Sequence, residues 1–208
     1  MRSLRSGEKT AVVVVISFAV ALGASLGLIS ITTPPPTRPQ APVYGPQSST
    51  PFIWPGKTRP PTVPAAAADL ADDEQVIGVV ASGKARAYRR AAFSGMVNHV
   101  VNDLVGETPV TVTHCDRDGC SRVFTGDGKE PLAFKTGGFL EGMLLYVDGV
   151  FYDQSTGRAR NDSGAASIPY QTLGFEETTW GKWRAAHPDT DVYLGSPAEG
   201  PTGPIVKE

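Results

Sequence analysis

The sequence predicts an α+β fold: a single compact, mostly antiparallel-β domain with two short helices, preceded by a transmembrane helix and a Pro-rich linker. Three observations lead to this prediction. The chain of 208 residues has an uncharged apolar run near its N-terminus, then a dense group of prolines, then many short β-branched runs separated by turn residues. Two stretches with helical spacing interrupt these runs, which is typical of an α+β domain.

The apolar run covers residues 11–31 and contains no charged side chain. A helix of this length rises about 31 Å, which matches the ~30 Å hydrocarbon core of a bilayer. Residues 1–10 carry three basic side chains against one acidic side chain, and positive flanks stay in the cytoplasm. We therefore expect a single-pass protein of the plasma (cytoplasmic) membrane, with its N-terminus inside and its C-terminal domain outside. Small residues late in the run leave a cleaved signal peptide open as the alternative.

Residues 32–64 contain 11 of the 18 prolines of the chain. Such a segment favours polyproline II over helix or central strand, so we predict a disordered linker between membrane and domain. Phe52, Ile53 and Trp54 are the exception, because large apolar side chains are unusual in a linker. They could dock on the domain itself or on a protein partner.

The domain is predicted over residues 65–195, and a disordered Gly- and Pro-rich tail over residues 196–208. Its strongest local signal is Asp148-Gly149 between two apolar runs. This dipeptide is typical of a type I′ hairpin turn, in which both central residues need a positive φ. The β-branched residues 110–115 predict a further strand.

Two helices are predicted within the domain. Apolar side chains between Phe93 and Leu104 recur at a period of 3.6 residues, with Gly106 placed to end the helix. A second, shorter helix over residues 178–187 places Trp180 and Trp183 on one face, toward the core.

Two cysteines, Cys115 and Cys120, bracket the predicted turn at residues 116–119. Opposed Cα atoms in an antiparallel pair lie about 4.5–5.5 Å apart, inside the range that a disulfide accepts. The predicted compartment is oxidising. We therefore expect a structural cross-strand disulfide. A redox-active pair is the alternative, although the spacing differs from that of a Cys-x-x-Cys motif.

A metal site is a further alternative for the same region. Cys115, Cys120, His99 and Asp118 would supply ligands suited to zinc or copper. No cofactor is predicted, and no catalytic residue is assigned, since neither a phosphate-binding loop nor a nucleophilic serine elbow occurs. The formal charge of −2 gives no footprint for nucleic acid.

Four motifs occur in order along the chain. They are His-Val-Val-Asn-Asp at 99–103, the strand 112–115 with Gly119, Tyr-Asp-x-x-Thr-Gly at 152–157, and Trp-Gly-Lys-Trp-Arg-Ala-Ala-His-Pro-Asp-Thr at 180–190. On these motifs the chain resembles the domain-of-unknown-function 3179 family over residues 73–194. The family has no established activity, so the resemblance implies a domain without implying a reaction.

The chain departs from the typical pattern of that family at three places. Asn98 and His99 stand where typical members have a His-Glu pair, Asp118 stands at the second cysteine position, and Arg160 replaces a tryptophan. If members use the histidine and the cysteine pair for metal or thiol chemistry, these changes imply a structural disulfide here, or a lost activity.

Together these patterns favour a membrane-anchored, extracytoplasmic domain of unknown biochemical activity. We expect a binding or structural module rather than an enzyme, with the membrane as its partner through residues 11–31. The alternative is an exported metal- or thiol-dependent enzyme centred on Cys115, Cys120 and His99. A third hypothesis is a subunit of a membrane complex that docks through Phe52–Trp54. The sequence indicates no ligand, substrate or oligomeric state.

Overall fold

The structure is a computed structural model that describes residues 52–95, 97–160 and 167–195. The predicted span at 11–31 lies outside these ranges, as do the residues before it and the tail at 196–208. Within the described ranges no helix is both long and apolar enough to cross a membrane. The predicted location outside the cytoplasm stays a prediction.

The described chain is mostly β, which corrects the predicted α+β class with two helices. It has three sheets and a single α-helix, α1 (Trp180–Ala186), with short 3-10 turns η1 (Ala65–Ala67) and η2 (Arg90–Phe93). Sheet one has the order β1 (Trp54–Pro55), β9 (Lys135–Phe139), β10 (Met143–Val147), β11 (Val150–Asp153). Sheet two has the order β12 (Gln171–Thr172), β8 (Ser121–Thr125), β7 (Thr108–His114), β6 (Val100–Val105), β2 (Lys57–Thr58). Sheet three has the order β13 (Glu176–Thr179), β4 (Gln75–Ala81), β5 (Lys84–Arg89), β14 (Asp191–Tyr193), β3 (Val63–Pro64).

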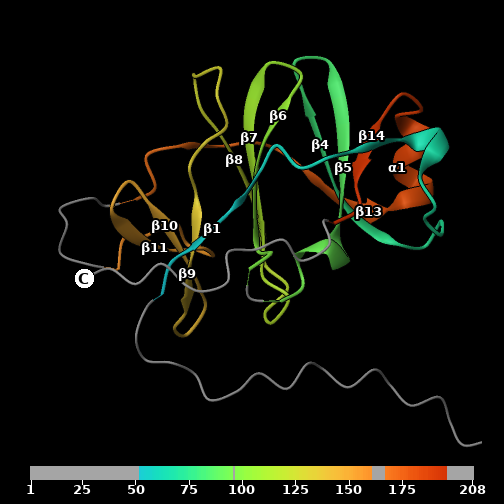
Figure 1. Cartoon of the computed structure of the whole chain (residues 1–208). Helices are drawn as coiled ribbons and strands as arrows, with labels where there is room; N and C mark the ends of the chain where they lie inside the picture. Colours follow the sequence, from blue (N-terminus) through green and yellow to red (C-terminus); the bar gives the residue numbers. More distant parts are fainter. Residues whose placement is uncertain (1–51, 96, 161–166, 196–208) are drawn as a thin grey trace, which may run out of the picture. The chain divides into compact units, whose positions relative to one another are not determined.

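The sheets and α1 form successive layers, with sheet two in the middle (Figure 1). One apolar cluster lies between sheets one and two and includes Val100, Phe124 and Leu145. A second lies between sheets two and three and includes Val101 and Ile77. A third packs sheet three against α1. Sheet two is therefore buried on both faces.

The predicted helix from Phe93 to Leu104 is wrong. The segment is the end of η2, a turn, and the central strand β6. Val100 faces one core cluster and Val101 the other, so consecutive residues are apolar although the segment is a strand. A strand buried on both faces lacks the alternation of polar and apolar residues that identifies a half-buried strand. In this segment the apolar residues also recur at the spacing expected of a helix. β-Branched side chains also favour the strand.

Two local predictions are confirmed. β10 and β11 pair antiparallel around Asp148 and Gly149, whose φ angles of 50° and 86° are the positive values of a type I′ turn. The short C-terminal helix forms as α1, and both Trp180 and Trp183 are buried. These signals succeed because each depends on a few neighbouring residues.

The linker predicted at 32–64 extends too far toward the C-terminus, because its last residues belong to the folded domain. Residues 54–64 supply β1, β2 and β3, which are edge strands of sheets one, two and three in turn. We call residues 52–64 the strap, and Figure 1 shows it crossing the sheets. Pro55 and Pro64 are accommodated because an edge strand can lack an outward N–H donor. Phe52, Ile53 and Trp54 pack on the domain itself beside β9, and Ile53 is 4 % exposed.

Replacing Ile53 by Ala is expected to lower the free energy of unfolding by about 2–4 kcal/mol, because a buried side chain is removed and the site cannot fully collapse. Val80→Ala is the control, since Val80 is 47 % exposed and should cost less than about 0.5 kcal/mol. Urea denaturation of both variants checks this. Equal losses for the two would mean that the strap does not stabilise the domain.

Candidate functional site

A cleft of about 530 Å³ opens between the ends of sheets two and three. We call it the His114 cleft. Its walls come from the segment entering β4, from η2 and the turn after it, from the end of β7, and from the β7–β8 turn. The lining residues are Asp73, Glu74, Gln75, Arg90, Ala91, Ser94, His114, Asp116 and Gly119. Because these segments are far apart in sequence, the tertiary fold alone creates the cleft.

The β7–β8 turn positions the acidic side of the His114 cleft. The Cys115 N–H donates to the Cys120 carbonyl at 2.9 Å, and the Gly119 N–H donates to the Cys115 carbonyl at 2.9 Å. Gly119 has a φ of 75°, which glycine adopts without strain. Asp118 caps the turn by accepting from the Cys120 N–H. The turn directs Asp116 toward the Gly95 N–H, which donates to its Oδ2 at 3.0 Å.

The second oxygen of Asp116 is unusual. Oδ1 is completely buried and has no hydrogen-bond partner among the described residues. His99 Nε2 lies 3.9 Å from it, too far for a hydrogen bond. A buried carboxylate oxygen without a donor costs free energy, and because Oδ1 is fully buried, a molecule in the His114 cleft does not contact it.

His114 is held by a chain of two hydrogen bonds. Its Nδ1 is 2.8 Å from Ser121 Oγ, and the Ser121 hydroxyl donates to Glu177 Oε1 at 2.5 Å. Phe93 contacts the imidazole edge to face. Glu177 belongs to β13 of sheet three, so this chain joins sheets two and three.

Both histidines at the site are shifted toward the neutral form. Burial lowers the pKa of His99, opposed by the Asp116 carboxylate and by the His114 carbonyl, which its Nδ1 contacts at 3.0 Å. Burial also lowers the pKa of His114, and the Arg90 cation lowers that pKa further. Burial therefore favours the uncharged form of each ring.

The cysteines form no disulfide: both Cys115 and Cys120 are free thiols. The predicted disulfide is thus corrected. Cys115 is buried in the cluster between sheets one and two, whereas Cys120 is only partly buried near Asp118 and Arg122. The backbones of Cys115 and Cys120 do lie opposite each other across the turn. This arrangement alone does not give the two side chains the orientation that a disulfide requires.

The thiol of Cys115 is predicted to be unreactive. Burial raises its pKa to about 11, so only about one molecule in 10⁴ carries the nucleophilic thiolate at pH 7. We expect an aromatic disulfide reagent to modify Cys115 at least about 100-fold more slowly than free cysteine, with both thiols reacting after unfolding. The single variants Cys115→Ser and Cys120→Ser assign the two rates. Rapid modification of native Cys115 would contradict this, as would the absence of two thiols in the unfolded chain.

The predicted metal ligands are not brought together. In the part of the chain that the structure describes, no group of three or more His, Cys, Asp or Glu side chains could hold a metal ion. Asp118 is exposed and binds the Cys120 N–H, while Cys115 faces a core cluster. None of the four lines the His114 cleft, although His99 Nε2 lies 3.9 Å from Oδ1 of the lining residue Asp116.

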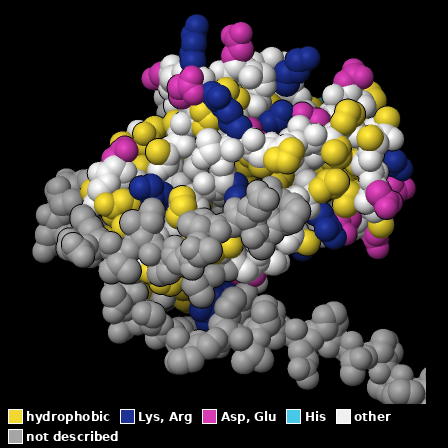
Figure 2. Space-filling view, in the orientation of Figure 1, with side chains coloured by type: hydrophobic (Ala, Val, Ile, Leu, Met, Phe, Trp, Pro, Cys, Tyr) yellow, Lys and Arg dark blue, Asp and Glu magenta, His cyan; other side chains and the backbone are white. Residues whose placement is uncertain are grey.

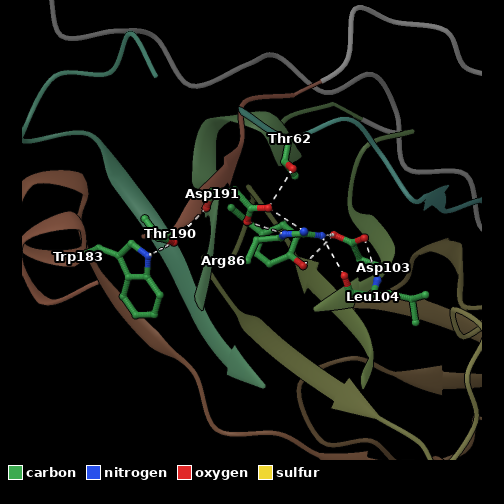
Figure 3. A network of polar contacts seen from close by, with 8 residues as sticks. Thr62, Arg86, Asp103, Leu104, Trp183, Thr190 and Asp191 are labelled. Atoms are coloured by element: carbon green, nitrogen blue, oxygen red, sulfur yellow. Dashed lines mark hydrogen bonds and ion pairs between the residues drawn. The ribbon is translucent and has the colours of Figure 1, made fainter. Parts of the chain in front are cut away.

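A second polar network, on the other side of the same core, is structural (Figure 3). Arg86 of β5 donates to Asp103 of β6 at 2.7 Å and to both oxygens of Asp191 of β14 at 2.8 Å. The Tyr88 hydroxyl donates to Asp103 at 3.0 Å. Asn102, the neighbour of Asp103, binds the Phe134 backbone on the opposite face of β6. The Asn-Asp part of the 99–103 motif therefore joins layers and does not line the His114 cleft.

Sequence reasoning missed most of the His114 cleft. Asp116 and His114 line the cleft but are not among the predicted site residues. Ser121 and Glu177, which hold His114 in place, are not among them either. Ser121 and Glu177 are 56 residues apart in sequence, and nothing local signals that β13 lies beside β4. The one usable signal was the polar sequence around 114–121 at the end of a buried strand.

Residues 51–200 match the family described as "Protein of unknown function (DUF3179)", so the chain belongs to that family. The resemblance found in the sequence motifs is thereby confirmed. No curated protein and no solved structure matches the chain.

Proposed function

We propose that this member of the DUF3179 family is a binding module that takes a small polar ligand in the His114 cleft. The observation that carries the proposal is the cleft itself, which segments far apart in sequence line with mostly polar side chains, among them Arg90, His114 and Asp116. The cleft volume suits a small molecule.

The surface in Figure 2 agrees with a small ligand rather than a nucleic acid or a broad protein interface. On that face acidic and basic side chains are interspersed, and hydrophobic side chains lie scattered between them. The exposed large apolar residues within the described ranges lie in separate segments: Val80 in β4, Leu140 in the β9–β10 loop and Phe175 in the β12–β13 loop. Nucleic-acid sites need a basic field, and docking faces usually need a contiguous apolar patch.

The alternative, an exported metal- or thiol-dependent enzyme at Cys115, Cys120 and His99, has less support. Burial raises the pKa of Cys115 and also that of Cys120, opposite to the depressed pKa of nucleophilic cysteines. We therefore place the function at His114 and Asp116 rather than at the cysteines.

The test is a nuclear magnetic resonance screen of small polar compounds against the ¹⁵N-labelled full chain. Compounds that bind should shift the backbone amides of Gly95 and Gly119, which flank the His114 cleft. Ala91→Phe should abolish these shifts by filling the cleft, because Ala91 lines it. Ala66→Phe is the matched control, since Ala66 is also an exposed alanine in a 3-10 turn. A screen with no shifts, or shifts that survive Ala91→Phe, would refute the proposal.

A further inference from the structure

We infer that residues 44–51, the segment directly before the strap, dock on the outer face of sheet one. This face is the side of the sheet that points away from sheet two, the middle layer (Figure 1). The inference concerns an interaction surface within the chain and is independent of the ligand proposed for the His114 cleft.

The outer face of sheet one is apolar, although the solvent-facing side of an antiparallel sheet is usually polar. Met143, Leu145 and Val147 of β10 point inward to the core cluster between sheets one and two. Leu144 and Tyr146 therefore point outward, because side chains alternate along a strand. Leu144 is only 2 % exposed and yet belongs to none of the three core clusters. Its cover therefore lies on the outer side of the sheet.

Two aromatic rings extend this apolar surface from β10 to β11. Tyr146 lies directly opposite Phe151, and their ring centroids are 4.9 Å apart. The Phe151 ring lies over Gly137 of β9, where an added Cβ would come within 2.8 Å of the ring and 3.1 Å of the Leu144 Cβ. Both rings are half-buried. Aromatic surfaces bind proline-rich segments in other proteins, because such segments are already extended and lose little entropy on docking.

The start of the strap indicates which segment occupies this face. The Phe52 backbone nitrogen, through which the preceding chain continues, lies 3.6 Å from the position that a Cβ on Gly138 would take. Gly138 pairs with Leu144 across β9 and β10. Ile53, the next residue of the strap, is 4 % exposed and also lies outside the three core clusters. The chain before Phe52 thus continues from a point beside Leu144.

Residues 44–51 suit the face in composition and in reach. They include Tyr44, Pro46 and Pro51 and carry no charge. Eight extended residues reach about 26 Å, whereas the four strands of sheet one span about 14 Å. Tyr44 can therefore reach Leu144 and Phe151. So short a tether gives a millimolar effective concentration, at which a weak contact is sufficient.

The other segments next to the described ranges suit the face less well. Residues 161–166 contain no apolar side chain larger than alanine. Residues 196–208 follow β14, which belongs to sheet three rather than sheet one.

Cleavage of the full chain by chymotrypsin after Tyr44 measures the docking, since a docked residue must be released before the protease can cut. Mass spectrometry follows the product that begins at Gly45. Phe151→Ser should raise the rate about tenfold, as expected for the loss of an aromatic contact. Phe175→Ser is the matched control, because Phe175 is an exposed phenylalanine in the β12–β13 loop, and it should change the rate less than about twofold. Equal rates in Phe151→Ser and the unaltered chain would overturn the inference.

Variants of Tyr44 test the same contact without altering the domain. In the full chain with ¹³C-labelled leucine methyl groups, Tyr44→Ser should shift the Leu144 signals, because an aromatic ring shifts the resonances of methyl groups beside it. Tyr44→Phe keeps the ring and should leave these signals in place. Unchanged Leu144 signals in Tyr44→Ser would overturn the inference. A shift of Leu144 on deletion of residues 196–208 would assign the face to the tail, and a shift that depends on protein concentration would assign it to a second copy of the chain. Either result also overturns the inference, and neither bears on the His114 cleft.

Discussion

Replacing Asp103 by Ala is expected to lower the free energy of unfolding by about 3–5 kcal/mol, the usual effect of removing one partner of a buried ion pair. The Asp103 side chain is 4 % exposed, and it accepts hydrogen bonds from both Arg86 and Tyr88 (Figure 3). Without Asp103, the Tyr88 hydroxyl loses its hydrogen-bond acceptor inside the core, and Asp191, which is more exposed, is the carboxylate that remains beside the Arg86 guanidinium. Both groups then carry an uncompensated desolvation cost.

The matched control is Asp191→Ala, which removes a carboxylate from the same guanidinium. The Asp191 side chain is 32 % exposed, so water can replace it, and we expect a loss of about 1–2 kcal/mol. Urea denaturation compares the two variants. The double variant Arg86→Met/Asp103→Leu should recover most of the stability lost by Asp103→Ala, since replacing a whole buried pair by apolar groups is often neutral. Equal losses for the two single variants, or no recovery in the double variant, would refute a cost due to unpaired buried charge.

Replacing Gly78 by Ala is expected to destabilise the packing of α1 on sheet three by about 2–3 kcal/mol or more, the upper range for overpacking. Gly78 lies in the middle of β4, and a Cβ at this position would overlap the six-membered ring of Trp183. Trp183 cannot simply turn away. It is 2 % exposed, and its Nε1–H donates to Thr190 Oγ1 at 3.0 Å.

Gly174→Ala is the control for the intrinsic effect of adding a methyl group. A Cβ at Gly174 meets no atom within 4 Å, so this change should alter stability by less than about 0.5 kcal/mol. A double-mutant cycle with Trp183→Leu isolates the contact, because Gly78→Ala should cost much less once the large ring is absent. Additive losses across the cycle would show that the overlap with Trp183 is not the cause.

The sequence was informative where structure depends on neighbouring residues. Asp148-Gly149 identified its hairpin, and Trp180 and Trp183 identified α1, because positive φ angles and helical spacing are local properties. It failed at β6, where burial on both faces removes the periodicity that distinguishes strand from helix. It failed again at the hydrogen-bond chain behind His114, because Glu177 reaches Ser121 only through the pairing of β13 with β4. Such long-range registers leave no local trace in one sequence.

The cysteine pair shows a second limit of prediction from the sequence. Cys115 and Cys120 do lie across the β7–β8 turn, as their spacing indicated. The prediction of a disulfide nevertheless depended on where each side chain points, and therefore on the neighbouring layer. Cys115 lies in the core between sheets one and two, where a small apolar side chain is suitable.

The strap is also part of the smallest complete domain, because it supplies edge strands to all three sheets. Without residues 54–64, the longer strands β9, β6 and β14 would become the edges of their sheets, and open edges are templates for pairing between molecules. The C-terminal end of the proline-rich segment thus forms edge strands that limit self-association. Pro55 and Pro64 contribute to this, because proline cannot donate a backbone hydrogen bond to another strand. A folding unit defined by the core alone, beginning at residue 65, would contain most of the buried side chains but would lack this protection against aggregation.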